Sequence, residues 1–140
     1  MSMNQLVRFG VSLEKGLLDK FDALLAERGF ASRSEAFRAL IRTSLIERDW
    51  KEGQEVAGAV TLIYDHRRKD LMGRITNTQH DYHQLIISTQ HIHLDHDRCL
   101  EIIAVRGRAA QVGRLADSLR AIKGVKHGTV SMSSVGKDLD

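Results

Sequence analysis

The stretch LIISTQHIHLDHDRCLEIIAVRG, residues 85–107, predicts a β-hairpin. Both of its halves are rich in β-branched residues, and a short polar segment separates them. Because side chains alternate along a strand, His91 and His93 share one face. A loop of three or five residues centred on His96 places His93 opposite Cys99 on that face, whereas a loop of two or four residues turns the sulfur to the other side. We expect the odd loop.

The sequence around this hairpin predicts further elements on both sides. A strand at residues 56–65 and a helix at 68–84 precede it, and a helix at 108–124 and a strand at 125–134 follow it. This βαββαβ order is typical of the α+β ferredoxin-like arrangement, here of the ACT type, in which both helices cover one face of an antiparallel sheet. Both faces of the hairpin are apolar, so we expect another subunit to cover the helix-free face and His91 and His93 to lie on it.

The N-terminal region predicts a smaller unit of one strand and two helices. Residues 6–13 alternate between apolar and polar side chains, a helical period then runs to Gly29, and SRSE opens a second helix with Ser32 at its N-cap and Glu35 three residues later. Such a unit leaves unpaired backbone groups and an incomplete core, so we expect two copies to intertwine as a dimer. We place this domain at residues 1–50, a linker at 51–57 and the ferredoxin-like domain at 58–140.

The composition indicates a globular protein of a reducing compartment. Of its 140 residues, 42% are hydrophobic, and the single cysteine cannot form an internal disulfide. The sequence has no apolar run long enough for a membrane span, so we expect a cytoplasmic protein with no membrane partner. Lys and Arg number 21 against 18 Asp and Glu, a balance that does not favour nucleic-acid binding by charge alone.

Histidines gather around the hairpin, where five of the seven lie between residues 80 and 96. His91, His93 and Cys99 offer two nitrogens and a thiolate, which leaves a four-coordinate site one donor short. His80 and His83, at the end of the preceding helix, are candidates for the missing donor, and we expect it to come from a neighbouring subunit. Such donors indicate a soft divalent metal, and both zinc and copper would fit them.

Two more polar residues are candidates for the shell around the ligands. Glu101 shares the face of Cys99, and Gln79 lies beside His80, so either could accept a hydrogen bond from a ligand imidazole. Glu101 could equally be a surface carboxylate paired with Arg74 or Arg98. We expect His66 to have no convergent partner.

The segments VRFGVSLEKGLLDKFDALL, residues 7–25, and RGFASRSEAFRALIR, residues 28–42, resemble the ribbon-helix-helix DNA-binding module. The resemblance implies a dimer that lays a two-stranded ribbon in the major groove of double-stranded DNA. Arg8 is then the best base reader, and Gly10 has no side chain with which to read. Ser12 could bond to a base edge, and it also lies where the first helix needs an N-cap, so its role is shared.

Contacts to the DNA backbone are expected at two other places. The N-terminus of the second helix, near Arg33 and Ser34, offers free amides to a phosphate. The basic residues Arg68 and Lys69 either form a solvated turn or contact phosphates nonspecifically.

The segment STQHIHLDHDRCLEI, residues 88–102, follows TQH at residues 78–80 and a ribbon-helix-helix unit, and this pattern is similar to the nickel-responsive repressors of the NikR family. The resemblance covers nearly the whole chain. It implies a square-planar nickel(II) site of His91, His93 and Cys99 from one chain and His80 from another, in a homotetramer built as a dimer of dimers. It also implies nickel-dependent repression at an inverted-repeat operator. A second cation site at Glu35 is disfavoured, because Ala39 replaces its usual acidic partner.

Other classes of function stay open on the residues alone. A metal-storage or metallochaperone protein explains the histidines but not Arg8 and Ser12. A ribbon-helix-helix regulator that senses an amino acid or another metal explains the N-terminal unit but leaves Cys99 without a role. A zinc enzyme needs an open coordination position and a nearby general base, and four protein ligands leave no such position, so we expect no enzymatic activity.

Overall fold

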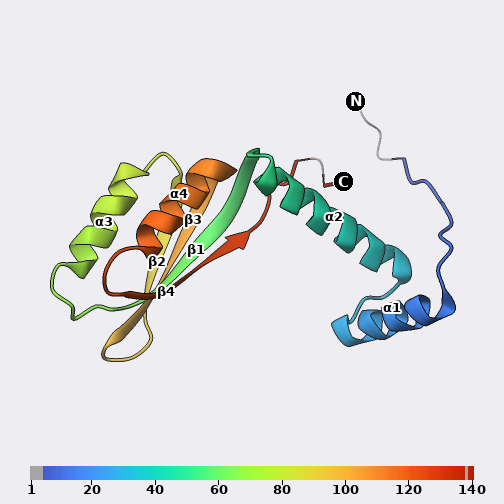
Figure 1. Ribbon diagram of the computed structural model, residues 1–140, viewed down its shortest axis with the longest axis horizontal. Coiled ribbons are helices and arrows are strands. Elements are labelled where there is room, and N and C mark those ends of the chain that lie inside the picture. The colour runs from blue at the N-terminus through green and yellow to red at the C-terminus, as the bar shows by residue number, and fades with distance from the viewer. Residues whose placement is uncertain (1–4, 138) are drawn as a thin grey trace. The chain divides into compact units, whose positions relative to one another are not determined.

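The computed structural model describes residues 5–137 and 139–140 (Figure 1). Its elements follow in the order α1 (Lys15–Arg28), α2 (Arg33–Lys51), β1 (Glu55–Asp65), α3 (Leu71–Asp81), β2 (Ile86–His93), β3 (Arg98–Arg108), α4 (Ala109–Arg120) and β4 (Val125–Met132). The chain forms two compact units, and the boundary between them lies between Leu45 and Ile46, inside α2.

The C-terminal unit is built on a four-stranded antiparallel sheet in the order β2-β3-β1-β4. β1 pairs with β3 over its full length, from Glu55 opposite Arg108 to Asp65 opposite Arg98, and with β4 on its other side. The helices α3 and α4 cover one face of this sheet (Figure 1). This βαββαβ arrangement confirms the ferredoxin-like fold class predicted from the sequence.

The core of this unit lies between the sheet and its two helices. Leu71 and Ile75 of α3 and Leu115 and Leu119 of α4 are at most 1% exposed, and they pack in one cluster with buried residues of β1 and β3. Burying an aliphatic side chain of this size contributes about 1.5–3 kcal/mol to stability. This packing fixes the positions of the strands on which the polar cluster described below is built.

The hairpin between β2 and β3 has the register that the odd loop requires. His93 lies directly opposite Cys99, with residues 94–98 between them, and His91 lies opposite Glu101. This confirms the predicted side-by-side placement of His93 and Cys99.

The face on which these residues lie differs from the expectation. Cys99 and Glu101 are buried together with Ile103 and Val105 on the helix-bearing face, so His91 and His93 lie on that face too, and the prediction that they occupy the helix-free face was wrong. The helix-free face carries partly exposed residues of its own, all apolar except for Thr61: Ala57, Ala59, Thr61, Ile63, Leu100, Ile102 and Ala104. Alternation separates the two groups of residues, but it does not indicate which group the helices cover.

The N-terminal unit contains the two helices expected from the sequence. α1 ends at Gly29, whose φ of 72° lies in the left-handed region that glycine adopts at low cost. The hydroxyl of Ser32 accepts a hydrogen bond from the amide of Glu35 at 3.2 Å, as the predicted helix cap requires. The N-cap position of α1 is Glu14, so the suggestion that Ser12 caps this helix was wrong.

Residues 5–14, which were expected to contain a strand, have no regular secondary structure in the single chain. A strand requires a hydrogen-bonded neighbour, and the expected neighbour is the same segment of a second chain. The ring of Phe9 nevertheless packs edge-on against Phe37 of α2, with centroids 6.2 Å apart, and Phe37 packs against Phe21 of α1. One apolar side chain of this segment, Phe9, therefore already contacts α2.

The segment between α2 and β1 is shorter than the expected linker at residues 51–57. α2 continues to Lys51 and β1 begins at Glu55, which leaves three residues between them. The indole N–H of Trp50 donates a hydrogen bond to the carbonyl of Ser133 at 2.8 Å, and its ring lies against Gly58 of β1. The last turn of α2 is thus anchored to the sheet. No helix among residues 5–137 and 139–140 is long and apolar enough to cross a membrane.

Candidate metal centre

Two cross-strand rows on the helix-bearing face bring the polar side chains together. Tyr64 of β1, Cys99 of β3 and His93 of β2 form one row, and the neighbouring row contains Glu101 and His91. Directly opposed residues in an antiparallel sheet have Cβ atoms about 4.5–5.5 Å apart. These five residues therefore lie within reach of one another although they come from three strands.

The thiol of Cys99 is the centre of this cluster. Its Sγ lies 3.2 Å from Nε2 of His91, 3.3 Å from Nδ1 of His66 and 3.5 Å from Nδ1 of His93. Cys99 is fully buried, whereas His91 and His93 are exposed, so the imidazoles cover the thiol on the side open to solvent. Three ring nitrogens around one thiol are a donor set that suits a divalent transition metal.

His66 is a member of this cluster, and the expectation that it has no convergent partner was wrong. Among the described residues, the donor atoms of His66, His93 and Cys99 all lie within 4.8 Å of one another. The register of β1 against β3 places Asp65 opposite Arg98, which brings the next residue, His66, close to Cys99. His66 and Cys99 are 33 positions apart in the sequence, and only the pairing of β1 with β3 brings them into contact.

Ion pairs hold the turn that carries His66. The guanidinium of Arg67 donates to the carboxylate of Asp65 and also contacts Asp97 at 3.1 Å, and the amide of His66 donates to the carbonyl of Asp97 at 3.2 Å. Arg98 pairs with Asp95 in the hairpin loop. The turn after β1 is therefore linked to the hairpin loop at Asp97.

His80 lies apart from the cluster within the single chain. It is exposed near the end of α3, where its ring stacks on that of His83 with centroids 5.8 Å apart. The cluster of potential donor atoms found in the described part of the chain does not include it. One chain therefore assembles His91, His93 and Cys99, and it leaves the imidazole of His80 at its surface.

The two residues predicted to surround the ligands have different partners. Gln79 accepts a hydrogen bond from the hydroxyl of Thr89 at 3.3 Å. Glu101 is 7% exposed and accepts from the hydroxyl of Tyr64 at 3.4 Å rather than from an imidazole. The suggested ion pair of Glu101 with Arg74 or Arg98 is not formed, since Arg74 donates to the carbonyl of Lys123 and Arg98 pairs with Asp95.

Burial and negative charge control the protonation of the two buried groups. Burial raises the pKa of the Cys99 thiol, and the nearby carboxylates of Glu101, Asp65 and Asp95 raise this pKa further. Burial likewise raises the pKa of Tyr64, with Glu101 as the next contributor, so the phenol keeps its proton. A bound cation would oppose the effect on Cys99, because positive charge favours the thiolate.

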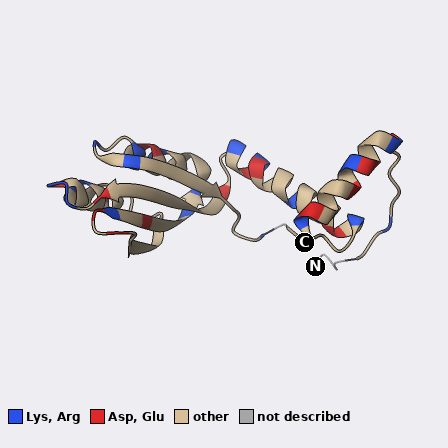
Figure 2. Ribbon diagram, turned by 90° about the horizontal axis from the view of Figure 1, so that it is seen from below, with Lys and Arg blue, Asp and Glu red and all other residues tan. Residues whose placement is uncertain are grey.

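The residues of the N-terminal unit that are expected to contact DNA are exposed in the single chain. Figure 2 shows that both positively and negatively charged residues lie along the helices of this unit. Arg8, Gly10 and Ser12 lie at the surface of residues 5–14. The guanidinium of Arg33 makes two hydrogen bonds to Asp22 of α1, at 2.9 and 2.8 Å. The backbone amides near Ser34, rather than the Arg33 side chain, are therefore the groups left for a phosphate at this helix end.

The two basic residues of the C-terminal unit lie just before α3. Arg68 and Lys69 are both exposed, and the guanidinium of Arg68 lies beside Gly124, whose added Cβ would be 3.1 Å from it.

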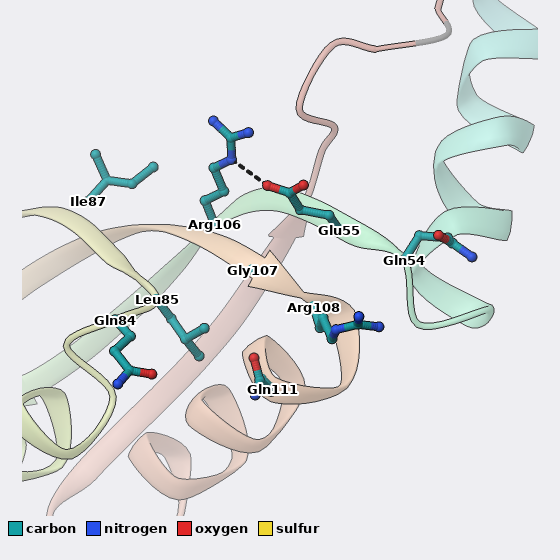
Figure 3. Close-up of a pocket in the computed structure, with 9 residues that line it drawn as sticks. All are labelled: Gln54, Glu55, Gln84, Leu85, Ile87, Arg106, Gly107, Arg108 and Gln111. Carbon is teal, nitrogen blue, oxygen red and sulfur yellow. Dashed lines mark hydrogen bonds and ion pairs between the residues drawn. The ribbon is translucent and has the colours of Figure 1, made fainter.

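A cavity of about 590 Å³ lies elsewhere in the C-terminal unit (Figure 3). Its lining includes Gln84, Gly107, Gln111 and the ion pair between Arg106 and Glu55, and none of the candidate metal ligands. Gly107 is eight residues from Cys99 along β3, so the cavity and the metal cluster are roughly 26 Å apart by the strand rise of about 3.3 Å per residue. The cavity therefore does not form part of the candidate centre.

Family models match both parts of the chain. Residues 57–133 match the NikR C terminal nickel binding domain, and residues 7–48 match the ribbon-helix-helix protein, copG family. The solved structure of an uncharacterized protein from Thermotoga maritima covers 56% of this chain and 98% of its own, with a TM-score of 0.51 and 14% identity. That likeness concerns the fold alone.

Several curated relatives span nearly the whole chain, and each bears the name "Putative nickel-responsive regulator". The protein of Syntrophus aciditrophicus is 54% identical over 96% of this chain and 98% of its own length. That of Chlorobium limicola is 52% identical over 96% and 100%, and that of Geobacter sulfurreducens is 47% identical over 98% and 99%. With two family models and relatives of this similarity, the chain belongs to the NikR family, and it combines a ribbon-helix-helix module with a NikR C-terminal nickel-binding domain.

Proposed function

We propose that this protein is a nickel-dependent transcriptional repressor of the cytoplasm. The observation that carries the proposal is the buried thiol of Cys99 surrounded by imidazole nitrogens at 3.2–3.5 Å, in a domain joined to a DNA-binding module. The donors alone do not distinguish nickel from copper or zinc, and family membership selects nickel(II).

The proposed nickel ligands come from two chains. His91, His93 and Cys99 of one chain already lie together, and His80 of a second chain supplies the fourth donor. The exposure of His80 supports this assignment, because its ring is accessible to a neighbouring molecule. Bound nickel supplies positive charge that favours the thiolate of Cys99.

His66 offers an alternative fourth donor from within the chain, and two substitutions separate the two ligand sets. A thiolate-bound planar nickel ion gives a charge-transfer absorption band. We expect His80→Ala to abolish this band and His66→Ala to retain it. The reverse result would place the fourth donor within one chain and contradict the two-chain assignment.

The assembly proposed for DNA binding is a dimer of dimers. Val7 and Phe9 are each 73% exposed in the single chain and Val11 is 50% exposed, so a second copy of this segment is needed to remove them from water. The partly exposed apolar residues of the helix-free sheet face offer a second surface for association between chains. A two-fold symmetric arrangement of ribbons fits an inverted-repeat operator.

Nickel and DNA are proposed to favour the same arrangements of the tetramer, so each shifts the same conformational equilibrium. An ion shared by two chains restricts their relative positions and so favours arrangements in which both ribbon dimers reach their half-sites. Coupling between two sites is typically about 1–3 kcal/mol, or roughly 5- to 150-fold in affinity. By reciprocity, operator DNA must tighten nickel binding by the same factor.

Gel-shift assays test the regulatory role. Using DNA from the region upstream of the protein's own gene, we expect wild-type protein to shift a fragment with nickel and to shift it much less after chelation. Cys99→Ala should behave as the chelated protein does. A storage protein or metallochaperone would give no nickel-dependent shift with any fragment, and this result would contradict the proposal.

A further inference from the structure

Tyr64 lies next to the candidate ligands, and its hydroxyl is in contact with three polar atoms. The side chain is fully buried and extends from β1 over the helix-bearing face. Its hydroxyl oxygen lies 3.1 Å from Nδ1 of His91, 3.2 Å from Sδ of Met72 and 3.4 Å from a carboxylate oxygen of Glu101. One hydroxyl group thus joins a candidate ligand imidazole to a buried carboxylate.

The number of protons available restricts how these contacts are made. A phenol has one O–H to donate, whereas its oxygen can also accept. Glu101 is 7% exposed, and the Tyr64 hydroxyl is the side-chain donor within its reach in the described residues. A buried carboxylate left without a donor is costly, and the thioether of Met72 is a weak acceptor, so the proton of Tyr64 belongs to Glu101.

This assignment determines the state of His91. Since the Tyr64 proton points to Glu101, the contact between Tyr64 and Nδ1 of His91 is a hydrogen bond only when Nδ1 carries a proton and donates it. A neutral imidazole has a single N–H, so Nε2 then keeps a free lone pair. Nε2 is the nitrogen that lies 3.2 Å from the Cys99 sulfur, at the centre of the donor cluster.

We propose that Tyr64 is a positioning residue of the nickel site, which fixes the His91 ring with Nδ1–H toward β1 and the lone pair of Nε2 toward Cys99. The proposal rests on the nickel site proposed above and adds a residue to it. Hydrogen bonds run in one direction, from His91 to Tyr64 and from Tyr64 to Glu101. Glu101, which was predicted to accept directly from a ligand imidazole, acts instead through Tyr64.

Tyr64→Phe is the variant that removes the hydroxyl and keeps the ring. We expect this change to weaken nickel binding about 10- to 100-fold, the usual effect of losing a group that orients a metal ligand. The affinity is measured on the full-length protein by competition with a chelator. Tyr82→Phe is the matched control, because Tyr82 is the only other tyrosine and packs against the same core. Its hydroxyl forms no side-chain hydrogen bond in the described residues, so we expect a change of less than about twofold.

The tautomer of His91, that is, which ring nitrogen carries the proton, is a property that a general loss of stability would not change. In ¹⁵N-histidine-labelled protein without nickel, at a pH at which the imidazole is neutral, long-range proton–nitrogen correlations should show His91 protonated at Nδ1, and Tyr64→Phe should make this state less populated. A double-mutant cycle with Glu101→Gln provides a second test. If Tyr64 acts together with Glu101, the double variant should bind nickel about as weakly as Tyr64→Phe alone.

The outcomes separate this inference from the proposed function. If wild-type protein shows no thiolate-to-nickel band, the proposed function fails. If wild-type shows the band but His91 carries its proton at Nε2, or Tyr64→Phe binds nickel as tightly as wild type does, the role of Tyr64 is overturned and the nickel site stands. The wild-type spectrum alone decides the tautomer even if Tyr64→Phe proves unstable.

Discussion

Arg8 is the residue for which we propose the most specific contribution to DNA binding. Its side chain is exposed next to Phe9, whose ring packs against α2, so its guanidinium is free to meet a base edge. We expect Arg8→Ala to weaken operator binding by about 1–3 kcal/mol in a gel shift and to leave the nickel absorption band unchanged.

Lys20→Ala is the control, because Lys20 is an exposed cation on α1 of the same unit. If Arg8 contributed only its positive charge, Arg8→Ala and Lys20→Ala would weaken operator binding to the same extent. Equal effects would therefore contradict base reading by Arg8.

Asp65 gives a prediction for stability at low pH. Hydrogen bonds from Arg67 lower the pKa of Asp65 from 3.8 to about 2. Because the folded pKa lies below the unfolded value, this carboxylate stabilises the fold above about pH 4, and the contribution is lost as the pH falls through about 2. We expect Asp65→Asn to lower the midpoint of thermal unfolding at pH 6 and to reduce the loss of stability between pH 6 and pH 2.

Asp117→Asn is the comparison, since Asp117 makes an exposed ion pair with Arg120 on α4, away from the hairpin loop. Surface pairs of this kind contribute little. If Asp65→Asn keeps the full acid sensitivity of the wild type, the ion pair with Arg67 is not the source of this sensitivity.

At the scale of elements, the end of α2 and the neighbouring strands β1 and β4 meet at Gly58. A Cβ at this position would lie 2.4 Å from the carbonyl oxygen of Ser131 and 3.2 Å from the ring of Trp50. The oxygen belongs to the backbone of β4 and cannot move away without disturbing the sheet. We therefore expect Gly58→Ala to destabilise the protein by about 1–3 kcal/mol in urea unfolding.

Gly113→Ala is the opposite case in the same domain. Gly113 lies within α4, and a Cβ there meets no atom within 4 Å, so the change should stabilise the helix by up to about 1 kcal/mol. A Gly58→Ala variant as stable as Gly113→Ala would show that α2 and β4 are not packed at Gly58 as described.

The sequence predicted elements and registers that depend on local patterns. The two helices of the N-terminal unit, the βαββαβ order and the opposition of His93 to Cys99 all follow from periodicity, capping residues and loop parity. These signals lie within short windows of the chain. They could therefore be read without knowing how distant segments pack.

Predictions that depend on the pairing of strands far apart in the sequence were missing or wrong. His66 joins Cys99 only because β1 pairs with β3, and periodicity in either strand does not give that register. The face that carries His91 could not be chosen, because Ile103 on one side and Ile102 on the other are equally apolar. A register proposed for β1 against β3 would have placed His66 near Cys99.

At the scale of the whole molecule, the account requires each nickel ion to join two chains. A single chain presents the Cys99 cluster and, apart from it, the exposed ring of His80. This arrangement predicts that a chain defective in one part is complemented by a chain defective in the other. His80→Ala keeps Cys99, and Cys99→Ala keeps His80.

Nickel titration of co-expressed His80→Ala and Cys99→Ala chains, read by the thiolate-to-nickel absorption band, tests this claim most directly. Each variant alone should show no band. In randomly mixed assemblies, about a quarter of the sites combine an intact Cys99 with an intact His80 from the neighbouring chain, so the band should return at about a quarter of the wild-type amplitude. A mixture as silent as the separate variants, or a band from His80→Ala alone, would contradict the account.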